Sequence, residues 1–235
     1  MKHQLGVIGF GNIAKAIVTP LLKNKLLKPE EIFCLVRSKK SLEFIKNSYE
    51  YKINIFDISS DQADLIWDCP YKLLSVKPQQ LNNIKEINNG NVKKSTIVSI
   101  LAGVTIKKLE ENFPNHNCVR AITNVPIIIG QGLTGISWNN KTDQKSQKFI
   151  RNIFSTSSRV YELSEDYLDI FLALTSSAPA IITLLIEALG DGGLSGGLQK
   201  ELSEELVIEM ILGTVLLLKD SKISTADLRN MVTSP

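Results

Sequence analysis

The sequence predicts an α/β protein in which a doubly wound, mainly parallel sheet over residues 1–160 is followed by an all-helical region over residues 161–235. Three observations lead to this fold. An apolar run at the N-terminus enters a glycine-rich turn and then an amphipathic helix. Apolar, β-rich runs next alternate with helical patterns, as in parallel sheets with crossover helices. Beyond about residue 160 only helical patterns remain.

Composition limits the class of protein. The chain has 235 residues, 43% hydrophobic and 22% charged, which suits one large or two small domains with a core. The net charge of +3 is small and scattered, so nucleic acid is not an expected partner. No apolar run is expected to reach membrane-spanning length, and residues 1–25 lack a signal-peptide pattern, so no membrane association is expected.

The cysteines indicate a reducing compartment. Cys34, Cys69 and Cys118 are odd in number and lack CxxC spacing. They are therefore expected to be buried, reduced thiols in a cytoplasmic protein, with no metal site.

The glycine-rich turn at residues 6–16 (GVIGFGNIAKA) predicts a dinucleotide site. Gly9 permits the sharp turn, Gly11 lets the backbone approach a diphosphate, and Ala14 replaces a third glycine where helix and strand pack closely. The free N–H groups and the dipole of the following helix attract phosphate. The alternative is a tight strand–helix turn with no ligand.

The end of the second predicted strand, residues 32–36, indicates which nucleotide binds. An acidic residue at this tip selects NAD, whereas a basic one accommodates the 2′-phosphate of NADP. Here Arg37 offers a planar fork for phosphate, with Ser38 and Lys39 beside it. The sequence therefore favours NADPH, with NADH possible; an ordinary polar turn is the alternative.

Further strands are expected at residues 72–76, 96–100 and 118–122, with a weaker one near residues 53–56 and a last one at residues 132–138. Ligands of doubly wound sheets bind beyond the carboxyl ends of strands, so polar residues that follow these runs are candidates for the cleft. The residues expected to bind the cofactor are Gly9, Phe10, Gly11, Asn12, Ile13, Arg37, Ser38, Ser75, Val76, Lys77, Pro78, Ala102, Gly103 and Asn124.

The C-terminal region predicts helices near residues 165–175, 179–191, 198–219 and 224–232. Pro179 suits the first position of a helix, and the serines before it suit a cap, so a second anion site is expected there. The Asp-Gly-Gly sequence that follows is expected to end that helix. Because the helix is apolar on most sides in so small a domain, the sequence predicts a homo-oligomer.

Landmarks along the whole chain resemble those of a known family. They are GFGNIA (9–14), VKPQ (76–79), SILAG (99–103), VRA (119–121), Asn124, Pro126, ALT (173–175), Ser177, PA (179–180), EAL (187–189), DGG (191–193), GL (197–198) and VTSP (232–235). In this order they resemble the pyrroline-5-carboxylate reductases, which catalyse the last step of proline biosynthesis.

The resemblance implies a Rossmann domain, a helical dimerisation domain and hydride transfer from NADPH or NADH to a cyclic imine, giving L-proline. It implies that Ser177 and Ser234 hold the substrate carboxylate, with Thr175 a further candidate. Asn124 either contacts nicotinamide or substrate or makes a turn. The protonated imine is already electrophilic, so His3 and His116 are not expected to act as general bases.

The chain departs from the family pattern in three places. Residues 122–126 read ITNVP where the family has Met-Pro-Asn-Thr-Pro. Residues 175–181 read TSSAPAI where the family has Ser-Gly-Ser-Gly-Pro-Ala-Tyr, and the sequence stops at Pro235 where the family continues with Gly-Gly-Thr-Thr and another helix. The resemblance therefore indicates a divergent or C-terminally shortened member.

Two other functions fit parts of the sequence. A β-hydroxyacid dehydrogenase shares the N-terminal domain but needs a lysine in a glycine-rich helical motif, in which Lys200, Lys219 and Lys222 do not lie. A non-catalytic dinucleotide-binding regulator would tolerate the altered 175–181 segment, and it would bind cofactor without turnover.

Overall fold

The computed structural model describes residues 4–87 and 94–233. Contacts divide the chain into two compact units, Met1–Ser176 and Ser177–Pro235, and each is described by itself.

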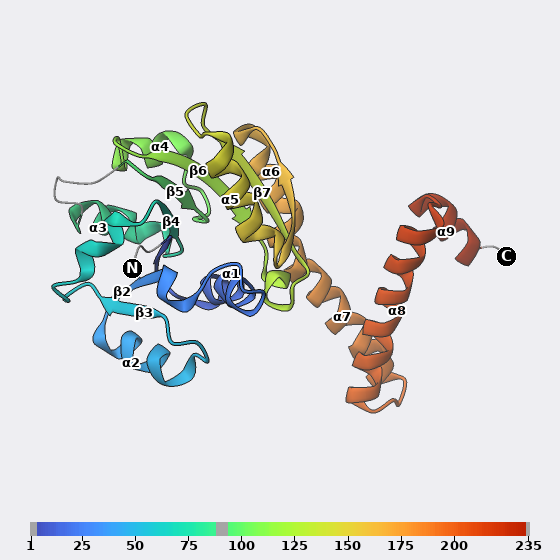
Figure 1. The fold of residues 1–235 in the computed structure, drawn as a ribbon. Helices are drawn as coiled ribbons and strands as arrows, with labels where there is room; N and C mark the ends of the chain where they lie inside the picture. Colours follow the sequence, from blue (N-terminus) through green and yellow to red (C-terminus); the bar gives the residue numbers. More distant parts are fainter. Residues whose placement is uncertain (1–3, 88–93, 234–235) are drawn as a thin grey trace. The chain divides into compact units, whose positions relative to one another are not determined.

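The first unit is built on one eight-stranded sheet with the strand order β3-β2-β1-β4-β5-β6-β7-β8 (Figure 1). Neighbouring strands are parallel except β6 and β7, which are antiparallel. This mainly parallel sheet confirms the predicted fold class. The strands are β1 Leu5–Ile8, β2 Ile32–Val36, β3 Asn54–Asp57, β4 Tyr71–Leu74, β5 Thr96–Ser99, β6 Asn117–Thr123, β7 Gly132–Trp138 and β8 Ser158–Glu162.

Helices cover both faces of the sheet because its central strands are apolar on both sides. On one face, Ile17 and Phe154 belong to a buried cluster with the strands; on the other, Leu109 and Phe113 do so. The α-helices of this unit are α1 Asn12–Lys23, α2 Lys39–Ser48, α3 Leu81–Ile87, α4 Ile106–Asn112, α5 Gln144–Ser155 and α6 Leu168–Leu172. Shorter 3₁₀ turns are η1 Pro29–Glu31, η2 Ala63–Asp68, η3 Pro78–Gln80, η4 Val125–Ile129 and η5 Glu165–Tyr167.

The prediction that β7 is the last strand is wrong, because β8 follows α5 and pairs with β7. β8 lies at the sheet edge, where its residues are half-buried or exposed, and it therefore lacks the apolar run of a central strand. Its Glu162 accepts hydrogen bonds from Arg151 and from Trp138 Nε1. Polar side-chain contacts thus help to hold this strand.

The predicted break before Pro179 is also wrong. Helical conformation continues from Glu165 to Ser195, because a five-residue π-turn, Ala173–Ser177, joins α6 to α7 (Ala178–Ser195). Ser177 itself has helical dihedral angles, and its side chain makes no capping hydrogen bond. The second anion site expected at a free helix start is therefore absent.

This continuity changes the expectation about membrane-spanning length. Glu165–Ser195 is long and apolar enough to cross a membrane, judged by length and composition only. The sequence pattern predicts two shorter helices there. Only 6% of its most apolar window is buried within the chain, so this surface needs a covering partner of some kind.

The second unit consists of α7, α8 (Lys200–Ser221) and α9 (Thr225–Val232). The prediction that residues 191–193 end α7 is wrong, since the helix continues to Ser195. Gly193 packs closely against α8: a Cβ there would lie 2.1 Å from Ser203 Oγ and 3.1 Å from Ser203 Cβ. The Ser203 hydroxyl also donates to the carbonyl of Gly190 at 2.7 Å. The glycines thus allow two helices to approach closely.

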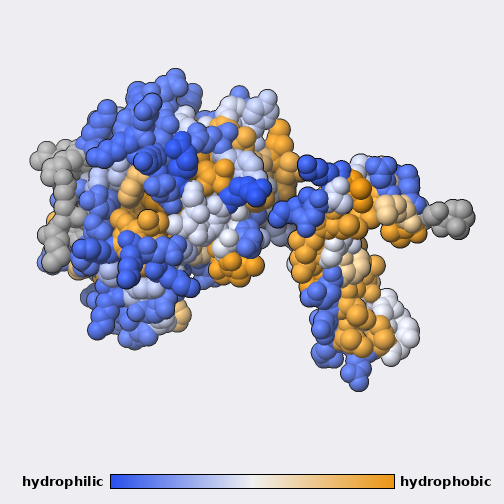
Figure 2. Space-filling view, turned by 45° about the vertical axis from the view of Figure 1, so that its right-hand side comes forward, coloured by the Kyte–Doolittle hydropathy of each residue, from blue (hydrophilic) through white to orange (hydrophobic). Residues whose placement is uncertain are grey.

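Most apolar side chains of the second unit face outward. Within its described residues only Gly190 and Ser203 are buried. Figure 2 shows the resulting hydrophobic surface over α7 and α8. The large exposed apolar residues of these helices are Ile181, Ile182, Leu184, Leu185, Leu189, Leu194, Leu202, Leu206, Ile208, Met210, Leu212, Val215, Leu216 and Leu217.

Candidate active site

The turn between β1 and α1 has two glycines with different structural requirements. Gly9 has φ +87°, and a Cβ there would lie 2.4 Å from the carbonyl oxygen of Ser75. A Cβ on Gly11 would meet nothing within 4 Å. The fold therefore requires Gly9, whereas the space beside Gly11 is open to a ligand.

The start of α1 is suited to an anion. Gly11 is its N-cap and supplies no side-chain hydrogen bond, and the first turn contains no acidic residue. The first N–H groups of a helix have no partner within the helix, and they carry the positive end of its dipole. A phosphate at this position would satisfy them.

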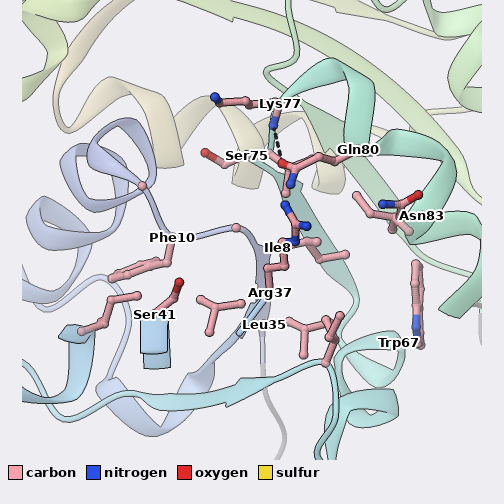
Figure 3. Close-up of a pocket in the computed structure, with 17 residues that line it drawn as sticks. Ile8, Phe10, Leu35, Arg37, Ser41, Trp67, Ser75, Lys77, Gln80 and Asn83 are labelled. Atoms are coloured by element: carbon pink, nitrogen blue, oxygen red, sulfur yellow. Dashed lines mark hydrogen bonds between the residues drawn. The ribbon is translucent and has the colours of Figure 1, made fainter. Parts of the chain in front are cut away.

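A cavity of about 370 Å³ opens beside this turn, at the carboxyl ends of β1, β2 and β4 (Figure 3). Arg37 extends into it from the end of β2. Lys77 and Gln80, which follow β4, also line it, and the Lys77 backbone N–H donates to Gln80 Oε1 at 3.1 Å. The Arg37 side chain extends toward Gln80 (Figure 3).

A second cavity of about 430 Å³ lies on the other side of the turn. Its lining shares Gly11, Ser75, Val76 and Lys77 with the first cavity. The lining of the second cavity also includes Ile100 and Thr123, at the ends of β5 and β6, and Asn12 and Ile13 at the start of α1. Two cavities that meet at a glycine-rich turn match the two halves of a dinucleotide, with the diphosphate at the turn.

Most of the predicted cofactor residues line one or both cavities: Gly9, Phe10, Gly11, Asn12, Ile13, Arg37, Ser75, Val76 and Lys77. Phe10 leaves the site open, because its ring packs edge-on against Tyr49 with centroids 5.1 Å apart. The other five predicted residues, Ser38, Pro78, Ala102, Gly103 and Asn124, do not line either cavity. Ser38 is instead the N-cap of α2, where its side chain accepts a hydrogen bond from Ser41 N.

Asn124, directly after β6, uses both ends of its side-chain amide within the chain. Its Nδ2 donates to the Thr175 carbonyl at 3.1 Å, and its Oδ1 accepts from Leu133 N at 2.8 Å. The Ser176 hydroxyl donates to the neighbouring Thr123 carbonyl at 3.1 Å. The π-turn is therefore attached to the carboxyl end of β6.

The three predicted substrate residues are in different situations. The Thr175 hydroxyl donates to the Phe171 carbonyl at 2.7 Å, so it is engaged within the helix. Ser177 is exposed. Ser234 lies outside the described residues.

Among the polar and aromatic residues that line the first cavity, four escaped the sequence reasoning, namely Ser41, Trp67, Gln80 and Asn83. Trp67 belongs to an apolar patch whose 3₁₀ conformation has no distinctive sequence signal. Gln80 and Asn83 follow Pro78, and only the strand end before that proline marked this region as part of the cleft.

At the opposite, amino-terminal edge of the strands, a buried polar chain joins β4, β5 and β6. Lys72 Nζ donates to Ser95 Oγ at 2.7 Å, and Ser95 Oγ lies 2.7 Å from His116 Nδ1. Burial lowers the pKa of Lys72 to about 8 and that of His116 to about 4. Neither cavity described above is lined by these groups, and the absence of a catalytic role for His116 stays a prediction.

Comparison with known proteins identifies relatives along the whole chain. A family model described as pyrroline-5-carboxylate reductase dimerisation matches residues 165–235, and one described as NADP oxidoreductase, coenzyme F420-dependent, matches residues 4–103. The pyrroline-5-carboxylate reductase of Synechocystis is 32% identical over 235 residues, which cover all of this chain and 86% of the relative. That of Glycine max is 27% identical over 235 residues, covering 84% of the relative.

Solved structures agree with these relatives. The Plasmodium falciparum pyrroline carboxylate reductase with NADP bound superposes with a TM-score of 0.82 at 28% identity, over all of this chain and 86% of that one. The enzyme from Coxiella burnetii gives a TM-score of 0.80 at 29% identity, with the same coverage.

Proposed function

This chain belongs to the pyrroline-5-carboxylate reductase family, and we propose that it reduces 1-pyrroline-5-carboxylate to L-proline with NADPH. The observation that carries this conclusion is the identity of 32% over all 235 residues, which includes both the nucleotide cleft and the helical unit. A shared N-terminal domain alone would leave the reaction open, because many activities use this fold.

The residues of the cleft fit NADP. The open space beside Gly11 and the uncapped start of α1 suit the diphosphate, and Arg37 suits the 2′-phosphate at the end of β2. When bound, NADPH supplies the hydride that converts the protonated imine of the substrate to a secondary amine. NADH should be tested as a second cofactor, since Arg37 adds affinity for the 2′-phosphate of NADPH but does not exclude the 2′-hydroxyl of NADH.

The protein's own contribution is to bind and orient. We propose that Ser177 and Ser234 donate to the substrate carboxylate and that Thr175 helps to position it. The hydroxyl of Ser177 is available, because it is exposed and makes no capping bond. Since the protonated imine is electrophilic, orientation beside the nicotinamide supplies much of the rate enhancement without a dedicated base.

The alternatives are less favoured. A β-hydroxyacid dehydrogenase would need its own catalytic lysine motif, and the relatives along the whole chain are pyrroline-5-carboxylate reductases. A non-catalytic regulator is less favoured because the relatives of this chain are named as enzymes. Turnover with pyrroline-5-carboxylate separates it from the reductase.

We further propose that residues 1–160 act as the nucleotide domain and residues 161–235 as the substrate and dimerisation domain. Homodimerisation through α7 and α8 is supported by the family description of residues 165–235 and by the exposed apolar residues there. It also accounts for the apolar Glu165–Ser195 segment without a membrane. A cytoplasmic location fits the free cysteines Cys34, Cys69 and Cys118, all buried.

The decisive experiment is an assay of NADPH oxidation with pyrroline-5-carboxylate, with L-proline identified as product. Turnover that depends on both substrates is expected. NADPH binding without turnover would instead support the regulator. Light scattering of the detergent-free protein tests the dimer, and a monomer at all concentrations would contradict it.

A further inference from the structure

The helix that carries Thr175 and Ser177 contains a backbone carbonyl that cannot have its α-helical donor. In an α-helix, the carbonyl of residue 175 would accept from the N–H of residue 179. Residue 179 is proline, which has no N–H and whose ring crowds the carbonyl four residues earlier. The local π-turn at Ala173–Ser177 accommodates this proline.

Asn124 supplies a donor from outside the helix. Its Nδ2 lies 3.1 Å from the Thr175 carbonyl oxygen, although the two residues are 51 positions apart. Its Oδ1 accepts from the backbone of Leu133 on β7, which fixes the amide in one orientation. Asn124 is only 5% exposed, so a lost partner on either side would leave a polar group buried without compensation.

The same strand end holds the π-turn at a second point. Ser176 Oγ donates to the carbonyl of Thr123, which lines the cavity at the β5 and β6 side of the glycine turn. Close packing supports this arrangement, because a Cβ on Gly135 would lie 3.0 Å from Leu168 and 3.1 Å from Phe171, both on α6. Residues 175 and 176 are therefore fixed beside the half of the cleft that would receive nicotinamide.

We propose that Asn124 is a positioning residue for the substrate. By binding the Thr175 carbonyl, it holds the π-turn in register with the end of β6, and so sets where the hydroxyl-bearing residues of that turn meet the substrate carboxylate. This inference rests on the proposed reductase function. It is an alternative to direct contact of Asn124 with nicotinamide or substrate, because each end of its amide already has a partner within the chain and the residue is only 5% exposed.

Asn124→Asp tests the proposed bond, and a control that also converts a buried Asn to Asp accounts for the added charge. The substitution keeps the shape and the acceptor for Leu133 N, and it removes the donor to Thr175. The matched control is Asn112→Asp on α4, because Asn112 is 4% exposed and its Nδ2 donates to the Lys108 carbonyl at 2.8 Å. Both variants lose one buried amide-to-carbonyl hydrogen bond, but only one of these bonds involves the π-turn.

The readouts are the KM for pyrroline-5-carboxylate, kcat, and the Kd for NADPH measured by fluorescence, on the full chain. We expect Asn124→Asp to raise the substrate KM about tenfold, since a small displacement of binding groups has effects of this size. The Kd for NADPH should stay within about twofold, because the diphosphate site is separate. Asn112→Asp should leave both constants near wild type, whatever stability it loses.

The outcomes are distinguishable. If the wild type is active and the two variants have the same substrate KM, the positioning role is overturned and the proposed function stands. If Asn124→Asp weakens NADPH as much as the substrate, Asn124 serves the cofactor and the role is again overturned. If the wild type binds NADPH and never turns over, the proposed function fails, and the positioning role fails with it.

Discussion

Arg120 Nη2 on β6 lies 2.6 Å from Asp169 Oδ1 on α6, while Arg120 Nη1 lies 3.5 Å from Glu165 Oε1. The guanidinium is almost fully buried, whereas Asp169 is largely exposed. Glu165 Oε1 also accepts from Ile106 N at 2.7 Å, at the start of α4. One arginine thus joins the sheet to the helix that leads into the π-turn.

Removing the close carboxylate should lower stability. In Asp169→Ala, Arg120 stays buried with only the longer contact to Glu165, and we expect the free energy of unfolding to fall by about 1–2 kcal/mol. Urea denaturation measures this difference. Asp166→Ala is the control, because Asp166 is exposed and forms no ion pair with any residue in the described ranges. Equal midpoints for the two variants would show that the Arg120–Asp169 pair contributes nothing.

The two glycines of the first turn should respond differently to the same change. In Gly9→Ala the new methyl group would meet the Ser75 carbonyl at 2.4 Å with φ at +87°, so we expect a loss of at least about 2 kcal/mol of folding stability. In Gly11→Ala the methyl group meets no protein atom, so folding should be nearly unchanged. It would occupy space at the phosphate site, and the Kd for NADPH should rise about tenfold or more.

Thermal melts and NADPH titrations of both alanine variants provide the check. Loss of nucleotide affinity without loss of stability is expected only at Gly11. An unchanged Kd in Gly11→Ala would place the nucleotide elsewhere than at the start of α1.

Arg37 should determine the preference between the two nucleotides. Arg37→Ser removes a charged partner of the 2′-phosphate, so the KM for NADPH should rise about tenfold or more while that for NADH changes little. Lys46→Ser, at the exposed last turn of α2, controls for the loss of one positive charge nearby. Parallel kinetics with both nucleotides give the answer. A similar rise in the KM for NADPH in both variants would mean that the effect comes from the loss of positive charge in general and not from Arg37 itself.

His116 should make stability depend on pH in acid. Burial, followed by the nearby charge of Lys72, lowers its pKa to about 4 in the folded protein, whereas the unfolded value is near 6.5. Below pH 6.5 the unfolded chain therefore binds a proton that the folded chain does not. The stability contributed by neutral His116 is complete above pH 6.5 and is lost as the pH falls toward 4, by at most about 3 kcal/mol.

His116→Asn preserves an acceptor for the backbone and hydroxyl of Ser95, which both contact His116 Nδ1. This variant should lose less stability between pH 6.5 and 4 than the wild type does. Denaturation midpoints across that interval measure the difference. Parallel pH profiles would mean that His116 does not control acid stability.

Much of the first unit could be predicted from the sequence, because each central strand is a short apolar run bounded by turn residues. Residues 32–36, for example, coincide with β2. The weak run near residues 53–56 also forms a strand, β3. β8 could not be predicted in this way, since at the sheet edge backbone pairing and polar contacts replace apolar burial.

The glycine turn and Arg37 were predictable because their chemistry is local: a turn, a helix start and a strand end. The attachment of residues 175 and 176 to β6 was not. Pro179 preceded by serines is typical of a new helix, whereas here a π-turn accommodates the proline and a distant side chain, Asn124, binds the Thr175 carbonyl. Ser41, Trp67, Gln80 and Asn83 join the cleft through the fold, and no short motif marks them.

The outward-facing leucines of α7 and α8 bear on how this protein behaves in a living cell. If a second copy covers them, folding is linked to mass action, and the melting temperature should rise with chain concentration. If the chain is poorly expressed, the activity would then fall more steeply than the concentration of the chain. A copy that still dimerises but cannot bind nucleotide would sequester functional partners, so a single defective allele could act dominantly.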